Sequence, residues 1–316
     1  MEKFLTKKIN VFFLSICAMF LWGSAFPVLK LSYELLQIES FEVYPKIYFA
    51  GIRFFWASIL VFLISRFIFN VKISLKREDL IPIVVLGFLQ TAVQYFFFYV
   101  GVGNTSGIKS SILQSSGAFF IVIFSHFIFI DDKMSRQKII SMFFGFLGII
   151  VININSDFDL AFNITGEGFL LISAIISAIA TIIVRKIAKS INPLMLTGSQ
   201  MLVGSLILLG IGRYGSNGRS LRFEGAALYL LIYAIFISAV AFLIWYMLLT
   251  YNKPGEISLY RFFIPVFGTI LSAIFLPEDK FTIETIMGLL LVVTGMIVLN
   301  YKNINLKGEK QCQQRG

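Results

Sequence analysis

Two long polar side chains, Gln114 and Arg261, lie inside otherwise apolar runs of this sequence, and Arg53 interrupts a third run in the same way. A charge in hydrocarbon costs about 2.5–3.5 kcal/mol or more, so such residues are candidates for function. The planar fork of an arginine is suited to binding a carboxylate or a phosphate. These residues therefore predict a site for an anionic group, with a guanidinium that snorkels to the membrane interface as the alternative.

Further polar and aromatic side chains within the apolar runs are candidates for the same site. They are Gln90, Gln94, Tyr99, Tyr246, Ser258 and Trp22. Gln90 and Gln94 are four residues apart and share one helix face, which we expect to look inward because amides need partners in lipid. Hydrogen bonds between helices are the competing explanation for this face. Trp22 could stack on a substrate ring or only pack against other helices.

The composition places these residues in a membrane. Of the 316 residues, 58% are hydrophobic, 16% aromatic and only 14% charged, whereas a soluble domain has about 45–50% apolar and about 25% charged residues. A mean hydropathy of +0.86 with 35 phenylalanines exceeds what one water-soluble core can bury. The two cysteines, Cys17 and Cys312, lie in an apolar run and in a polar tail, so they imply no disulfide framework.

Ten apolar runs are long enough to cross a bilayer, which takes about 20 residues in a helix. The runs are 9–30, 48–69, 80–100, 107–130, 137–154, 166–187, 194–214, 225–250, 256–276 and 281–300. Lipid offers no partners for unpaired backbone groups, and the runs lack the alternating polarity of barrel strands. We therefore expect an all-α membrane protein with ten transmembrane helices.

The basic residues are scattered over the connectors and indicate an orientation. With the N-terminus in the cytoplasm, the inner segments hold 18 Lys and Arg residues, the outer segments hold 6 and the spans hold 3. The positive-inside rule then places both termini in the cytoplasm, in agreement with an even number of spans. The net charge of +10 does not indicate nucleic acid, which needs a clustered basic face.

The two halves of the sequence resemble each other at a shift of 147 residues. Residues 119–153 align with 266–300 without a gap and with ten identities. Equivalent pairs include Asp132 with Asp279, Lys133 with Lys280, Gln114 with Arg261, Tyr99 with Tyr246, and Gly51 with Gly198. Each half has five spans, so the second half enters from the opposite face. Such inverted repeats are typical of secondary transporters.

These halves define the predicted organisation of the chain. We expect a first five-helix repeat at 1–155, a second at 156–301 and a cytoplasmic tail at 302–316. The chain lacks a phosphate-binding loop and the Cys/His spacing of a metal site, so neither a cofactor nor a metal is predicted. No aspartate or glutamate lies deep in any predicted span. Proton relays usually rest on buried carboxylates, so we expect export or exchange without proton coupling.

Several short motifs add a family resemblance. They are Trp22-Gly23 followed by Ser24, Ala25 and Pro27, Arg53 after Gly51, Ile264-Pro265, Pro277-Glu278, and the small residues Gly288 and Gly295. Over about residues 8–300 the sequence thereby resembles the ten-helix EamA branch of the drug/metabolite transporter superfamily. Ala118 departs from the family pattern, which usually has a proline at this place in the fourth helix. The resemblance implies transport of amino acids, other small metabolites or toxic compounds through a central cavity.

We therefore predict a secondary transporter, an exporter or exchanger that works by alternating access in a cell membrane of the bacterial inner-membrane type. Its substrates are expected to be amino acids or related carboxylates. An exchanger of organic anions such as sugar phosphates is the alternative, and a multidrug efflux carrier fits Arg261 less well. An intramembrane enzyme would need a nucleophile, metal ligands or paired carboxylates at depth, and a channel would need rings of charge or carbonyls. The expected partners are a small-molecule substrate and the lipid bilayer, with the chain as a monomer or homodimer.

Overall fold

The computed structural model describes residues 2–39, 41–72, 74–104, 110, 113–152, 163–216, 218, 220–276 and 283–313, and the regular elements in this part of the chain are all helices. In the first half the helices are α1 (Glu2–Thr6), α2 (Lys8–Leu35), α3 (Val43–Leu63), α4 (Arg77–Leu86), α5 (Gln94–Gly103), α7 (Gly117–Ile128) and α8 (Arg136–Ile152). In the second half they are α9 (Phe169–Ile187), α10 (Pro193–Gly215), α11 (Ala226–Tyr251), α12 (Pro254–Ile257), α13 (Phe263–Phe275) and α14 (Ile283–Gln313). Short π-helical segments extend three of them, η1 (Ile64–Ile68), η2 (Gly87–Val93) and η3 (Ile164–Gly168), and a 3-10 turn, η4 (Ser258–Phe262), joins α12 to α13.

Seven of the described helical segments are long and apolar enough to cross a membrane. They are Lys8–Leu35, Val43–Ile68, Arg77–Gly103, Ile164–Ile187, Pro193–Gly215, Ala226–Tyr251 and Pro254–Phe275. Leu113–Ile128 and Ile286–Leu299 are shorter apolar helices. These two and α8 coincide with the remaining predicted runs, apart from the run ends that lie outside the described residues. That all ten cross the bilayer stays a prediction.

Local side chains set where the helices begin. The Asn192 side chain accepts a hydrogen bond from the Leu194 N–H at 3.0 Å, and Pro193 occupies the first position of α10. An asparagine cap followed by proline is a strong start signal, because the proline lacks the N–H that the first turn leaves unpaired. The Asn163 side chain likewise accepts from the Thr165 N–H at 2.9 Å at the start of η3.

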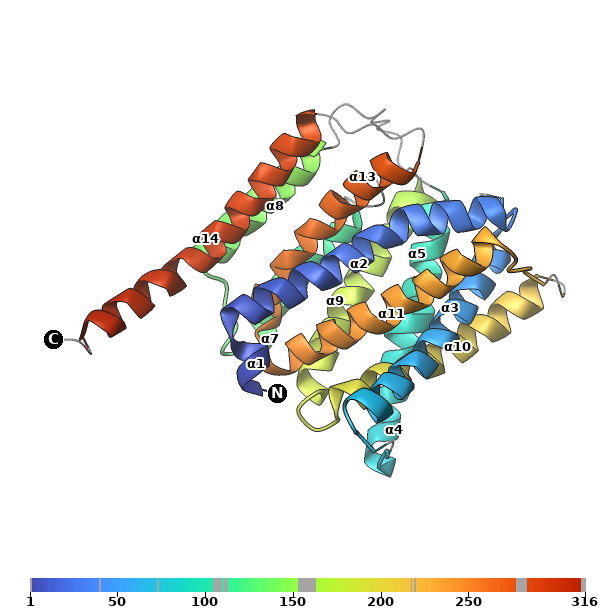
Figure 1. The fold of residues 1–316 in the computed structure, drawn as a ribbon, viewed down its shortest axis with the longest axis horizontal. Helices are drawn as coiled ribbons and strands as arrows, with labels where there is room; N and C mark the ends of the chain where they lie inside the picture. The colour runs from blue at the N-terminus through green and yellow to red at the C-terminus, as the bar shows by residue number, and fades with distance from the viewer. Residues whose placement is uncertain are drawn as a thin grey trace.

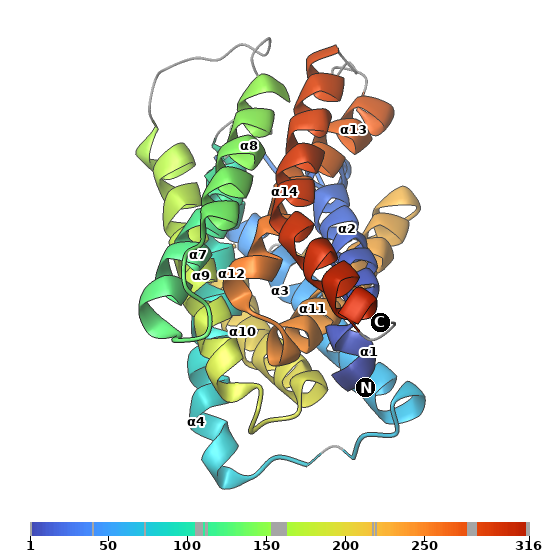
Figure 2. The same ribbon diagram turned by 90° about the vertical axis from the view of Figure 1, so that its left-hand side faces the viewer.

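The helices form one bundle, and α8 and α14 pack together at its edge as a two-helix rib. Figure 1 shows α2, α3, α10 and α11 across the bundle, and α8 beside α14 at the margin. In Figure 2 the loop that follows α7 lies at the same end of the molecule as α12 and the N-terminus. A hydrogen bond ties the N-terminal segment to this end, since Asn252 Nδ2 donates to the Leu5 carbonyl at 2.9 Å.

The contact between α3 and α10 repeats itself with the halves exchanged. A Cβ on Gly51 would lie 2.7 Å from the backbone nitrogen of Leu209, and a Cβ on Gly198 would lie 2.8 Å from Cε1 of Phe62. Gly51 and Gly198 are 147 residues apart, and so are Phe62 and Leu209. Contacts that exchange in this way are those made across a twofold axis. The glycines let the two helices approach more closely than a side chain would permit.

The rib repeats the same arrangement. A Cβ on Gly148 would lie 2.6 Å from the Gly288 carbonyl oxygen, and a Cβ on Gly295 would lie 2.9 Å from the Ser141 carbonyl oxygen. The shift of 147 again converts one contact into the other. The sequence repeat is therefore also a repeat of helix contacts in space.

Candidate functional site

One cavity brings most of the predicted site residues together. About 60 Å³ inside it is open to the centre of a water-sized molecule. It is lined by Trp22, Ala25, Phe26, Arg53, Gln90, Gln94, Tyr95, Phe98, Gln114, Ser177, Thr181, Phe242, Trp245, Arg261 and Ile264. These residues come from both halves, so the cavity lies at the junction that the pairing of Gln114 with Arg261 predicts.

Arg261 presents its guanidinium at this cavity with few partners. It lies in the 3-10 turn η4 and is 5% exposed, which is too buried for a side chain that snorkels to the interface. Nη1 and Nη2 each donate to the Ser177 hydroxyl at 3.2 Å, while Nε is buried and has no hydrogen-bond partner among the residues that the structure describes. Within the described ranges, its side chain makes no ion pair with a carboxylate.

Gln114 contributes an acceptor to the same cavity. The side chain is 8% exposed, and its Oε1 is buried without a hydrogen-bond partner among the described residues. A buried amide oxygen that lacks a donor is costly, so it is a candidate to accept a hydrogen bond from a bound molecule. The two residues at equivalent positions of the halves thus offer opposite chemistry, a charged donor and a neutral acceptor.

Aromatic rings form much of the remaining wall. The Trp22 ring centroid lies 5.3 Å from that of Phe242 and 5.6 Å from that of Trp245, both in edge-on arrangements. The Trp22 Nε1–H is buried without an acceptor in the part of the chain that the structure describes. Trp22 therefore packs against α11 and also offers the cavity a hydrogen-bond donor.

Arg53 lines the cavity but is held by neighbouring helices. Its Nε donates to the Ala234 carbonyl at 3.0 Å and to the Ser238 hydroxyl at 2.7 Å, and its Nη1 donates to the Tyr99 hydroxyl at 3.1 Å. These bonds tie α3 to α11 and α5. Tyr99 is fully buried and lies outside the lining residues. In this conformation Arg53 is more committed to protein partners than Arg261 is.

Gln90 and Gln94 bind each other across one helical turn. Gln90 Nε2 donates to Gln94 Oε1 at 2.5 Å, both side chains are buried and both line the cavity. The inward face that their spacing predicts is thus present. Gln90 lies in the π-helical segment η2, a type of distortion that often occurs at functional sites.

Two predicted residues of the second half lie away from the cavity. Tyr246 and Ser258 are buried, but neither is among the lining residues. The Tyr246 hydroxyl and the Ser258 hydroxyl have no hydrogen-bond partner among the described residues. A binding role for either residue stays a prediction.

The cavity also contains polar residues that the sequence analysis did not identify, Ser177 and Thr181. Both are buried on α9, and the Ser177 hydroxyl accepts the two hydrogen bonds from the Arg261 guanidinium. Ser173, Ser177 and Thr181 recur every four residues, which places them on one helix face. That spacing was a usable signal. Across the described ranges no group of three or more His, Cys, Asp or Glu residues could hold a metal ion.

The fold and the cavity define a polytopic helical membrane protein with a polar site between two related halves. The model of the EamA-like transporter family matches residues 9–154 and again residues 164–301. The chain belongs to this family, within the drug/metabolite transporter superfamily, and it is a membrane transporter rather than an enzyme.

Similar proteins agree with this assignment. An uncharacterized transporter of Archaeoglobus fulgidus is 28% identical over 88% of this chain and 94% of its own length. The uncharacterized transporter YvbV of Bacillus subtilis is 24% identical over 90% of this chain and 89% of its own length. A solved crystal structure superposes with a TM-score of 0.75 at 14% identity, covering 95% of this chain and 99% of that one, and shows the same fold.

Proposed function

We propose that this protein exports or exchanges amino acids or related carboxylates through its central cavity. The observation that carries the proposal is the guanidinium of Arg261, buried at the cavity with one serine hydroxyl as its hydrogen-bond partner in the described part of the chain. A buried guanidinium without a carboxylate is costly, and an anionic substrate compensates that cost when it binds.

The acceptor on Gln114 favours an amino acid over a simple anion. A carboxylate bound to Arg261 leaves the buried Oε1 of Gln114 in need of a donor, and an ammonium group supplies one. A cationic drug would meet the positive charge of Arg261 in the same cavity and bind poorly. The aromatic wall around Trp22 suits the apolar part of a substrate.

A second candidate is an exchanger of organic anions such as sugar phosphates. The observation that favours it is the presence of Arg53 in the same lining as Arg261. Two guanidinium groups suit a ligand with more than one negative charge. This candidate ranks second because Arg53 already donates to three protein oxygens.

The proposed mechanism is alternating access by two inverted five-helix repeats, with both termini in the cytoplasm of a cell with a bacterial-type inner membrane. The exchanged contacts of Gly51 and Gly198 support two structurally related halves. Related halves of opposite orientation give two conformations of similar energy, each open to one face.

A counterflow screen on purified protein in proteoliposomes tests the substrate class. Vesicles loaded with one unlabelled amino acid should accumulate the same labelled amino acid, and uptake should saturate with concentration. Uptake of labelled phosphate esters in place of amino acids would support the second candidate and reject the first. We expect no dependence on a proton gradient, and collapse of counterflow without one would contradict uncoupled exchange.

A further inference from the structure

A buried ion pair of the first half binds the backbone of the second half at the end of the bundle where the N-terminus lies. Asp132, in the loop between α7 and α8, pairs with Lys138 at the start of α8, and both side chains are almost fully buried. The second carboxylate oxygen of Asp132 accepts a hydrogen bond from the Gly255 N–H at 2.7 Å. Gly255 belongs to α12, in the other half of the chain.

The pair fits this place because residue 255 has no side chain. A Cβ at Gly255 would lie 3.0 Å from each carboxylate oxygen of Asp132 and 3.2 Å from the Nζ of Lys138. The ion pair therefore sits directly on the backbone of α12. Lys138 Nζ also donates to the Lys133 carbonyl at 3.0 Å, which fixes the loop around the pair.

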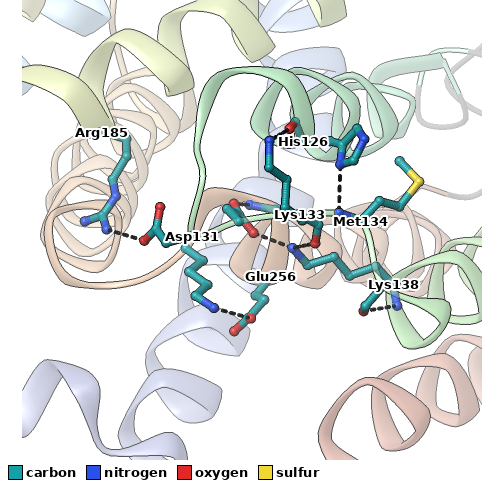
Figure 3. A network of polar contacts seen from close by, with 11 residues as sticks. His126, Asp131, Lys133, Met134, Lys138, Arg185 and Glu256 are labelled. Carbon is teal, nitrogen blue, oxygen red and sulfur yellow. Dashed lines mark hydrogen bonds and ion pairs between the residues drawn. The ribbon is translucent and has the colours of Figure 1, made fainter.

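Other bonds hold the same loop, as Figure 3 shows. Lys133 Nζ donates to the His126 carbonyl at 2.7 Å, and His126 Nδ1 accepts from the Met134 N–H at 3.0 Å. Arg185 of α9 lies 3.8 Å from Asp131 and donates to the Thr250 carbonyl at 2.6 Å. The loop of the first half thus contacts the end of α9 as well as α12, and Arg185 in turn binds the end of α11.

The contact at Gly255 leads directly to the cavity. Arg261 follows it in the helical segment formed by α12 and η4, and a rise of about 1.5–2 Å per residue places the two roughly 10 Å apart. Whatever fixes the start of this segment therefore also fixes the guanidinium at the cavity.

We propose that Asp132, charged and held by Lys138, is a latch that fixes the Arg261 segment and keeps the cavity closed toward the Asp132 face. This inference rests on the proposed alternating access, in which one face must close while the other opens. Asp132 acts through Gly255 and is a positioning residue. Opening toward its own face requires the Asp132–Gly255 contact to break.

Sided thiol labelling tests the latch without any substrate. In a background that carries Cys17→Ala and Cys312→Ala, Thr181→Cys places one thiol in the cavity lining. A membrane-impermeant maleimide is applied to each membrane face separately, and the face that labels Ile130→Cys is the Asp132 face, because Ile130 is 91% exposed in the same loop. We expect Asp132→Ala to raise labelling of the cavity thiol from this face by about tenfold or more, and to lower it from the opposite face.

Matched variants separate a latch from general loosening. Asp132→Ala combined with Lys138→Met should label like Asp132→Ala alone, because both changes remove one interaction. Glu78→Ala, in an exposed ion pair with Lys76, is the control and should label like the parent. Should Asp132→Ala not fold, Gly255→Ala disturbs the same contact through one methyl group and should shift labelling in the same direction.

Unchanged labelling from both faces, or an equal increase from both, would overturn the latch. The outcome is independent of the substrate screen. If counterflow fails while Asp132→Ala raises labelling from the Asp132 face, the proposed substrate is rejected and the latch is kept. If counterflow is normal while labelling is unchanged, only the latch is rejected.

Discussion

Arg53 and Gln200 occupy equivalent positions of the two halves, 147 residues apart, and each binds a hydroxyl at an equivalent position of the opposite half. Arg53 Nε donates to the Ser238 hydroxyl at 2.7 Å, and the Thr91 hydroxyl donates to Gln200 Oε1 at 2.6 Å. Thr91 and Ser238 are also 147 residues apart. The same contact between helices therefore occurs in both halves, with a charged guanidinium in one and a neutral amide in the other.

The two equivalent hydrogen bonds should contribute unequally to stability. Thr91→Val should cost about 0.6 kcal/mol, the average for a hydrogen bond between membrane helices. Ser238→Ala should cost about 1.5–3 kcal/mol, because its partner Arg53 is charged. Thermal unfolding of the detergent-solubilised variants measures both. Equal losses would show that the charge of Arg53 adds nothing to the contact.

Arg261 should contribute to the binding of carboxylate substrates. Arg261→Ala should raise the KM for carboxylate substrates about 10- to 100-fold, the effect of about 1.5–3 kcal/mol from a charged hydrogen bond. Analogues in which an amide replaces the carboxylate should be affected far less. Counterflow kinetics with both compounds measure the difference, and Lys76→Ala, whose side chain is 77% exposed, is the control. Equal loss for both compounds would reject the anion-binding role.

The close approach of α3 to α10 should depend on the absence of a side chain at Gly51. Gly51→Ala places a methyl group 2.7 Å from the Leu209 backbone nitrogen and should destabilise the protein by about 1–3 kcal/mol. Gly210→Ala is the matched control in α10, because no atom of the described residues lies within 4 Å of a Cβ placed there. The control should be neutral or slightly stabilising. Similar melting temperatures for the two variants would contradict the close contact of α3 with α10.

The predicted orientation of the spans in the membrane can be tested by labelling three exposed positions. Single cysteines at Phe41, which is 76% exposed, and Tyr214, which is 90% exposed, should react with an impermeant maleimide from outside the cell. A cysteine at Ile130 should react only from the cytoplasmic side. Labelling of all three from one side would disprove the predicted arrangement of spans.

The sequence was sufficient for the helical class and for the common location of Gln114 and Arg261. Apolar runs of this length dictate helices in lipid, and the repeat brings equivalent positions to one junction. The four-residue spacing of Gln90 and Gln94 likewise predicted a shared face, on which the two amides bind each other.

Other features depend on packing that a sequence does not reveal. The π-helical segment η2 and the 3-10 turn η4 interrupt the regular α-helix, and they contain Gln90 and Arg261. Equivalent positions also need not share an environment. Gln114 and Arg261 both line the cavity, whereas Gln200, the equivalent of Arg53, is absent from the lining.

The exchanged contacts of Gly51 with Leu209 and of Gly198 with Phe62 have an evolutionary consequence. A single five-helix ancestor pairing with its own copy would have made both with one glycine and one large apolar residue. At Arg53 and Gln200 the two halves keep the equivalent contact with different side chains, so this packing tolerates different chemistry at the same place.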